Sequence, residues 1–290
     1  MRFRTAGVLP RSALVTYVPI AHSAVADWRF RSSAVTHAGA VRAHNEDSYV
    51  DRPDLGLWAV ADGAGGHQAG DIASRIITDA LQALPPELGA TALLAEVRQR
   101  LAHAHNTLLA EAARRGGHAV LASTVVVLLA RDDYFACLWA GDSRAYLLRG
   151  GRFRQLTRDH SLVQELFDSG AISAAEAVRH PSANIITHAI GADVLELDKV
   201  TDRLLPGDRF LLCSDGLFKA LPEPELARIL AAEDDLAADR LLRAALDQQA
   251  DDNVTAVAVE ASHAEDWRDL AGRTEASAEN EPTRRHWGLR

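Results

Sequence analysis

The sequence predicts an α+β fold in which two antiparallel β-sheets pack as a sandwich, flanked on each side by a pair of helices. Three observations lead to this fold class. Short runs rich in β-branched and aromatic residues mark strands, and Gly150-Gly151 supplies a tight hairpin turn between two of them. Two segments with helical spacing of apolar residues follow the first strands, and two more follow the later ones. Blocks of strands that alternate with paired helices favour two packed sheets with the helices outside.

The first half of the chain is predicted to form strands and then two helices. The strands cover residues 30–37, 48–51 and 57–61, and the third runs into Asp62-Gly63 and a glycine-rich loop that ends at Gly70. Apolar residues on one face predict a helix over 72–84 and, after Pro85-Pro86, a second over 93–109. These two helices are expected to cover one sheet.

The second half is predicted to return to strands before its own helix pair. Strands are expected over 123–130, 134–140, 144–148, 153–156, 196–204, 209–214 and 254–259. Two short helices, 161–169 and 173–180, begin at serine residues that suit N-caps. The outer pair is expected at 223–231 and 236–249.

Composition limits the function classes. The 48% hydrophobic content over 290 residues supports a sizeable core. The net charge of −9 argues against a nucleic-acid or acidic-membrane surface, and part of it is available to bind cations. Cys137 and Cys213 both lie in apolar runs, which suits buried thiols and a cytoplasmic protein. No apolar run approaches the ~20 residues that span a bilayer.

Both ends of the chain are expected to lie outside the globular part. Residues 1–26 carry a short apolar run, but Pro10, Arg11 and Pro19 interrupt it, which favours a disordered extension over a secretory signal peptide. Residues 263–290 mix charge and small residues without periodicity and are predicted to be a disordered tail. The domain is therefore expected to cover 27–262.

Acidic residues recur next to apolar strands. One predicted strand runs into Asp62-Gly63, another into Asp215-Gly216, and Asp252 precedes the last strand. A single Asp-Gly is more often an ordinary turn, but two at strand ends with a third acidic site downstream indicate convergence. Gathered carboxylates repel one another unless hard divalent cations neutralise them, and Mg²⁺ or Mn²⁺ prefers such oxygen ligands. The pattern predicts metal-assisted chemistry.

A series of short motifs in a fixed order resembles a known family, the bacterial metal-dependent Ser/Thr protein phosphatases of type 2C. The motifs are Arg42-Ala43-His44-Asn45-Glu46-Asp47, Asp62-Gly63-Ala64-Gly65-Gly66-His67, Ala122-Ser123-Thr124, Gly141-Asp142-Ser143-Arg144, Ser214-Asp215-Gly216 and Asp251-Asp252-Asn253. The resemblance covers about residues 35–259. It implies a β-sandwich flanked by helix pairs with a small flap subdomain at about 160–188. It also implies two or three Mg²⁺ or Mn²⁺ ions and hydrolysis of phosphoserine or phosphothreonine in proteins.

The resemblance assigns roles to the acidic residues. It implies that Asp62 bridges two cations, that the carbonyl of Gly63 ligates one, and that Asp215 and Asp252 ligate the other. The water between the cations is then the nucleophile that attacks phosphorus, so no covalent phosphoenzyme is required. Glycine at position 63 lets the backbone approach an ion closely. Glu46 and Asp47 match positions that hold water-mediated metal ligands.

Three further roles follow from the same resemblance. Arg42 matches the residue that grips the substrate phosphate, which suits a planar guanidinium. Asp142 matches a third, weaker metal site shared with Asp215, although it could instead cap a hairpin. His67 is the candidate general acid, or alternatively a cap of the following helix. Ala64 departs from the family, in which histidine or methionine is usual. His103, His105 and His118 are expected on helix surfaces.

Competing functions remain open. A catalytically inactive phosphopeptide-binding or sensor module on the same fold is the main alternative. Dinucleotide binding is disfavoured because Gly63, Gly65, Gly66 and Gly70 lack the G-x-G-x-x-G spacing. A binuclear phosphodiesterase is disfavoured because no histidine occupies a matched ligand position. The expected partners are phosphorylated proteins and a cognate Ser/Thr kinase pathway, with no nucleic acid, no membrane and a monomeric chain. Residues 56–62 resemble members associated with type VI secretion.

Overall fold

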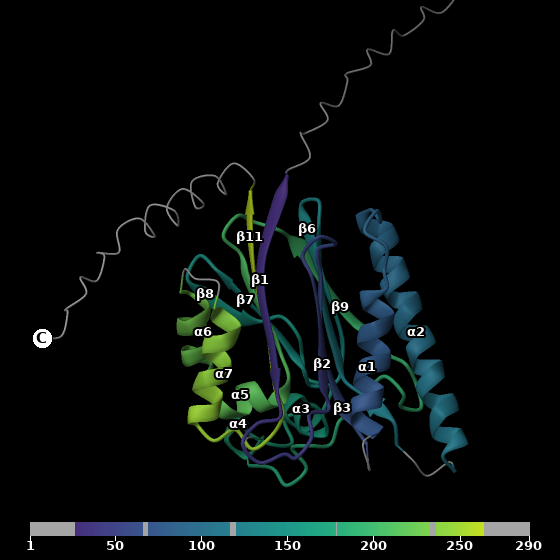
Figure 1. Cartoon of the computed structure of the whole chain (residues 1–290). Helices are drawn as coiled ribbons and strands as arrows, with labels where there is room; N and C mark the ends of the chain where they lie inside the picture. The colour runs from purple at the N-terminus through teal and green to yellow at the C-terminus, as the bar shows by residue number, and fades with distance from the viewer. Residues whose placement is uncertain (1–26, 66–68, 117–119, 178, 233–235, 264–290) are drawn as a thin grey trace, which may run out of the picture.

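The protein is a two-sheet sandwich between helices, as the sequence predicts (Figure 1). The computed structural model describes residues 27–65, 69–116, 120–177, 179–232 and 236–263. Neighbouring strands of both sheets pair antiparallel. The first sheet has the order β1 (Trp28–His37), β11 (Val254–His263), β10 (Arg209–Cys213), β7 (Arg144–Arg149) and β8 (Arg152–Gln155). The second has the order β2 (Asp47–Arg52), β3 (Leu57–Ala64), β5 (Val125–Arg131), β6 (Tyr134–Ala140) and β9 (Asp198–Arg203), with β4 (Ala122–Ser123) beside β3.

Helices cover the outer face of each sheet (Figure 1). The second sheet packs against α1 (Ala69–Gln82) and α2 (Ala90–Arg114). The first packs against α5 (Asp215–Ala220), α6 (Glu223–Leu230) and α7 (Ala237–Asp247). Two short helices, α3 (Leu162–Asp168) and α4 (Ala174–Ala177), lie in the segment expected to be the flap. In the described part of the chain, no helix has the length and apolar character to cross a bilayer.

The alternation of residues along β3 explains how one strand serves two layers. Leu57, Ala59 and Ala61 belong to the core shared with α1 and α2. Trp58 and Val60 belong to the core between the two sheets. Because successive side chains of a strand point to opposite faces, Asp62 continues the series of Trp58 and Val60 and points into the space between the sheets.

Several elements differ from the sequence expectation at their ends. Asp62 and Gly63 lie within β3 rather than at its tip, because β4 extends the pairing through Ala64. Asp215 begins α5, a helix that the sequence pattern did not predict because it has only six residues. α4 is shorter than the predicted 173–180, and β11 extends to His263 because it pairs with β1 over its whole length.

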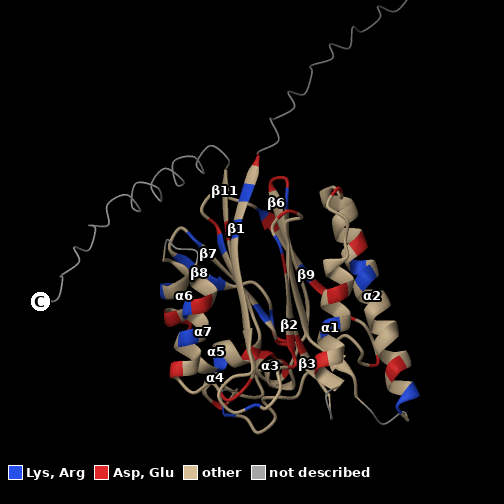
Figure 2. Ribbon diagram, viewed as in Figure 1, with Lys and Arg blue, Asp and Glu red and all other residues tan. Residues whose placement is uncertain are grey.

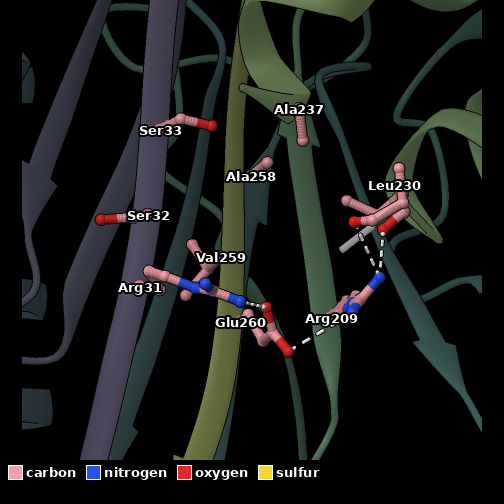
Figure 3. Close-up of a pocket in the computed structure, with 10 residues that line it drawn as sticks. Arg31, Ser32, Ser33, Arg209, Leu230, Ala237, Ala258, Val259 and Glu260 are labelled. Atoms are coloured by element: carbon pink, nitrogen blue, oxygen red, sulfur yellow. Dashed lines mark hydrogen bonds and ion pairs between the residues drawn. The ribbon is translucent and has the colours of Figure 1, made fainter. Parts of the chain in front are cut away.

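A small cavity of about 30 Å³ lies toward the far end of β11, where α6 ends against the first sheet (Figure 3). Glu260 accepts hydrogen bonds from Arg31 Nη2 at 2.6 Å and from Arg209 Nη2 at 3.4 Å. Arg209 Nη1 also donates to the carbonyls of Leu230 and Ala232. These contacts tie the end of α6 to β10 and β11, so we interpret the cavity as structural.

Candidate active site

Acidic residues of the second sheet and of segments next to the first sheet lie at one end of the sandwich (Figure 2). Asp62 of β3 lies within electrostatic range of Asp47, Asp215, Asp142 and Asp252. Burial is the main reason why its pKa lies well above the ordinary value, and the four neighbouring carboxylates raise it further. Residues predicted from five separate motifs therefore form one cluster.

Asp47 connects the two sheets. Its Oδ2 accepts hydrogen bonds from the hydroxyls of Ser214 and Thr255, both at 2.7 Å, while its buried Oδ1 has no partner among the described residues. Burial raises the pKa of Asp47 to about 7; the two hydroxyls oppose this, and Asp215 and Asp252 add to it. A buried carboxylate with one unsatisfied oxygen indicates a site for a positively charged partner.

Thr124 fixes the backbone of Asp62. The Asp62 N–H donates to Thr124 Oγ1 at 3.2 Å, and the Thr124 N–H donates to the Asp62 carbonyl at 2.9 Å. Thr124 Oγ1 also shares a hydrogen bond of 2.7 Å with Ser143 Oγ. The strand that carries Asp62 is thereby anchored to the loop that carries Asp142.

Asn253 organises the backbone around Gly63. The Gly63 N–H donates to the Glu46 carbonyl at 3.2 Å, whereas the Glu46 N–H donates to Asn253 Oδ1 at 2.8 Å. The Glu46 N–H therefore donates to Asn253 and not to the Gly63 carbonyl across the strand pair. A Cβ at Gly63 would lie 1.9 Å from the carbonyl oxygen of Gly70, so only glycine allows this close approach.

Asp252 is paired with Arg42. The guanidinium Nη2 of Arg42 lies 2.8 Å from Asp252 Oδ2. The Arg42 side chain is 55% exposed, so it can turn toward a ligand while it remains beside the acidic cluster. The predicted phosphate-binding residue therefore lies at the mouth of the candidate site.

Asp215 begins α5 and is held by a lysine. Lys219 Nζ lies 2.5 Å from Asp215 Oδ2 and donates to Asn184 Oδ1 at 3.0 Å. Burial would lower the pKa of Lys219, but Asp215, Asp142 and Asp252 outweigh it and raise that pKa. The sequence analysis did not single out Lys219, although its spacing of four residues from Asp215 was a signal.

Asp142 is buried in the loop before β7. Burial raises its pKa to about 7, Asp215 and Asp159 add to the rise, and Lys219 opposes it. The preceding Gly141 has a φ of 111°, and a Cβ there would lie 2.5 Å from the side chain of Thr124. The sharp turn at Gly141 is what brings Asp142 to the cluster.

Arg144 contacts α5 and was not predicted as a site residue. Its guanidinium lies 2.6 Å from Asp159 Oδ2 through Nη2 and 2.9 Å from Oδ1 through Nε. The same guanidinium lies 3.7 Å from the ring centroid of Phe218. Since Phe218 is in α5, this contact helps fix the helix that begins with Asp215.

A largely apolar groove of about 650 Å³ opens beside the cluster. Ala64, which follows Gly63, and Thr124, which holds the Asp62 backbone, belong to its lining. Leu109 of α2, Val120 and Ile186 form apolar parts of its wall. A polypeptide segment bound at the acidic cluster would therefore have an apolar surface next to it.

Other predicted residues are also accounted for. His67 and His118 lie outside the described residues. Glu46 packs over the start of α1, where a Cβ on Gly70 would lie 2.7 Å from its carboxyl carbon. His105 was expected on a helix surface but is buried. Its Nδ1 accepts a hydrogen bond from the Gly191 N–H at 3.1 Å. In the described ranges, no three acidic, histidine or cysteine side chains are arranged to hold a metal ion as they stand.

Comparisons with known proteins agree with the geometry. The serine/threonine phosphatase stp of Listeria welshimeri is 34% identical over 246 residues, which cover 81% of this chain and 98% of that protein. Among solved structures, PppA, described as a key regulatory component of the type VI secretion system in Pseudomonas aeruginosa, is 42% identical with a TM-score of 0.74. That match covers 81% of this chain and all of the PppA chain.

A solved relative contains metal ions. The catalytic domain of the serine/threonine protein phosphatase PstP, solved in complex with two manganese ions, is 32% identical with a TM-score of 0.74. The match covers 81% of this chain and 99% of that domain. The predicted fold class and the predicted activity, metal-dependent serine/threonine protein dephosphorylation, are confirmed at this level. The family model for protein phosphatase 2C matches residues 37–249, and the chain belongs to that family.

Proposed function

We propose that this chain hydrolyses phosphoserine and phosphothreonine in proteins at the cluster around Asp62, with Asp62, the Gly63 carbonyl, Asp215 and Asp252 holding two divalent cations. The observation that carries the proposal is that Asp215 and Asp252, from two distant segments, both lie within electrostatic range of Asp62 at one end of the sandwich. Glu46 and Asp47 are the proposed water-mediated ligands.

The residues fit a pair of Mg²⁺ or Mn²⁺ ions. All proposed donors are oxygen atoms, the ligand type that these cations prefer. The buried and unpartnered Asp47 Oδ1 and the raised pKa values of Asp47 and Asp62 are consistent with a cluster built around positive charge. Asp215 and Asp252 pair with Lys219 and Arg42 through Oδ2 alone, so the Oδ1 atom of each carboxylate takes no part in the ion pair.

The chain's own residues prepare the reaction. Bound divalent cations supply positive charge and lower the pKa of water near a phosphate. Arg42 is proposed to bind two oxygens of the substrate phosphate through its guanidinium. Thr124 and Asn253 keep the Asp62 and Gly63 backbone in place, so that little reorganisation is required when substrate binds. His67 remains a candidate for the proton donor to the departing oxygen. A third metal site at Asp142 would require Lys219 to leave its contact with Asp215.

The proposed substrate is a phosphorylated protein. The groove beside Asp62 offers apolar contacts to residues that flank the phosphorylated side chain. A cognate Ser/Thr kinase is the proposed opposing enzyme. The 42% identity with PppA supports a role in the regulation of type VI secretion. The phosphatase domain is proposed to cover residues 27–262 and to be monomeric.

Phosphate release from a phosphothreonine peptide tests the proposed function. Activity is expected with Mn²⁺ and is expected to vanish with EDTA or in the Asp215→Asn variant. Robust turnover in EDTA would overturn the metal-dependent mechanism. Inactivity under all three conditions with tight phosphopeptide binding would favour the alternative, an inactive sensor module on the same fold.

A further inference from the structure

Lys219 places its ammonium group against the carboxylate of Asp215. The Nζ atom lies 2.5 Å from Asp215 Oδ2 and 3.0 Å from Asn184 Oδ1, so two different segments hold it. The Asp215 side chain is only 13% exposed and that of Lys219 is 39% exposed. An ordinary helix surface pair is more exposed and has a single partner, so this contact is more constrained than its i, i+4 spacing alone implies.

The same ammonium group acts on the other carboxylates of the cluster. Asp142 and Asp252 lie within its electrostatic range in addition to Asp215. The family resemblance implies a third metal ion shared by Asp142 and Asp215. Such an ion would have to bind next to this positive charge. A divalent cation a few ångströms from an ammonium group is strongly repelled in a partly buried site.

We propose that Lys219 replaces the third metal ion: its ammonium, held against Asp215, supplies a fixed positive charge at the cluster and excludes a third divalent cation. The inference rests on the proposed function, which assigns Asp215 to one of two ions. The lysine contact uses Oδ2 of Asp215, so Oδ1 remains available to that ion. A tethered cation cannot dissociate, so this charge does not depend on the metal concentration.

Arginine and lysine differ in how they would fill this position. Lysine carries a compact charge with freely rotating donors, which can contact Asp215 and Asn184 together. Lys199, the other lysine of the chain, is exposed on β9 and provides a matched control. Substitutions at both lysines therefore separate the loss of a positive charge in general from its loss at the cluster.

The test is a count of bound Mn²⁺ by equilibrium dialysis and atomic absorption. Wild type, Lys219→Arg and Lys199→Gln are expected to bind two ions. Lys219→Gln and Lys219→Asp are expected to bind a third, at least tenfold more tightly than any additional ion on wild type. Thermal melting provides a second readout, because added Mn²⁺ above the concentration that fills two sites should raise the Tm of the Lys219→Gln variant only.

The outcomes separate the two proposals. Three ions on wild type, or two ions on both folded Lys219→Gln and Lys219→Asp, would overturn the role of Lys219 and leave the proposed function intact. Wild type that binds no Mn²⁺ would overturn the proposed function and this inference with it. Circular dichroism establishes that each variant is folded. If the added carboxylate of Lys219→Asp prevents folding, the ion count on Lys219→Gln alone decides the test.

Discussion

Asp47 and Asp62 stand directly opposite each other across β2 and β3. The neighbouring residues Glu46 and Gly63 share a backbone hydrogen bond, so the Asp47–Asp62 pair is a non-hydrogen-bonded one, in which opposing side chains are closest. Two carboxylates in this arrangement destabilise a sheet. The pairing therefore costs stability at the place where the proposed function needs negative charge.

Asp62→Asn should separate activity from stability. We expect kcat to fall about a thousandfold, since ligand loss removes several kcal/mol of metal-derived stabilisation. In EDTA the same variant should be more stable than wild type by up to about 1 kcal/mol, because the like-charge pair is relieved. For a domain of this size this is a Tm increase of roughly 2–4 °C. Differential scanning calorimetry measures the change.

Asp208→Asn is the matched control for that prediction. Asp208 is fully buried, and both of its oxygens accept hydrogen bonds from Arg149 at 2.7 Å. Asparagine at 208 weakens this pairing and leaves Arg149 with Asp202 and the Arg203 carbonyl as its remaining partners, so the protein should be destabilised by about 1–3 kcal/mol. If both substitutions lower the Tm equally in EDTA, the interpretation of the Asp47–Asp62 pair is wrong.

The carboxylate cluster predicts how stability without metal depends on pH. The pKa values of Asp47 and Asp142 rise to about 7 in the folded state, mainly through burial, against about 3.9 when unfolded. The folded state then binds more protons, so the stability in EDTA should fall as pH rises from about 4 through about 7. Mn²⁺ binding requires deprotonated ligands, so Mn²⁺ affinity should rise over the same range.

Urea denaturation in EDTA at pH 5.5 and 7.5 checks this dependence. Asp47→Asn removes one of the titrating groups and keeps an oxygen that can accept the hydroxyls of Ser214 and Thr255. The difference in unfolding free energy between the two pH values should therefore be smaller in this variant. An equal pH dependence of stability in both proteins would show that Asp47 does not contribute to it.

The sequence was sufficient for the fold class and for a set of acidic residues that the fold brings to one candidate site. Apolar periodicity located the long helices, because each faces one buried layer, and apolar runs located most strands, because the central ones are buried on both faces. The order of the acidic motifs pointed to Asp62, Asp215 and Asp252, and the fold brings the last two within electrostatic range of Asp62. These features depend on local pattern, which a single sequence contains.

Features that depend on tertiary contacts were not predictable. The pairing of β4 with β3 carries the strand past Asp62, although the glycines after it indicate a loop. The contacts of Lys219 with Asn184 and of Arg144 with Phe218 join segments far apart in the chain. No local pattern distinguishes such residues from surface charges, so their positions required the folded structure.

The groove beside the cluster predicts that a substitution in its wall impairs the reaction with peptide substrates but not with small substrates. Leu109→Asp places a charge on its apolar wall, at a position that is 37% exposed and should tolerate the change. We expect KM for an apolar phosphothreonine peptide to rise several-fold, while kcat/KM for p-nitrophenyl phosphate stays unchanged. Leu205→Asp, at a similarly exposed leucine outside the groove, should alter neither. Equal losses on both substrates would argue against peptide binding in the groove.

The hydrogen bond between His105 and Gly191, a residue of the groove lining, predicts that the protein loses stability in acid. Burial lowers the pKa of His105, and its Nδ1 accepts the Gly191 N–H, which a protonated imidazole could not do. Because the folded-state pKa lies below the unfolded value of about 6.5, this residue should reduce stability as pH falls below about 6.5. His105→Gln can accept the same hydrogen bond without titrating. Urea denaturation between pH 7.5 and 5 with saturating Mn²⁺ should show wild type losing more stability than the variant, and parallel curves would contradict the role of His105.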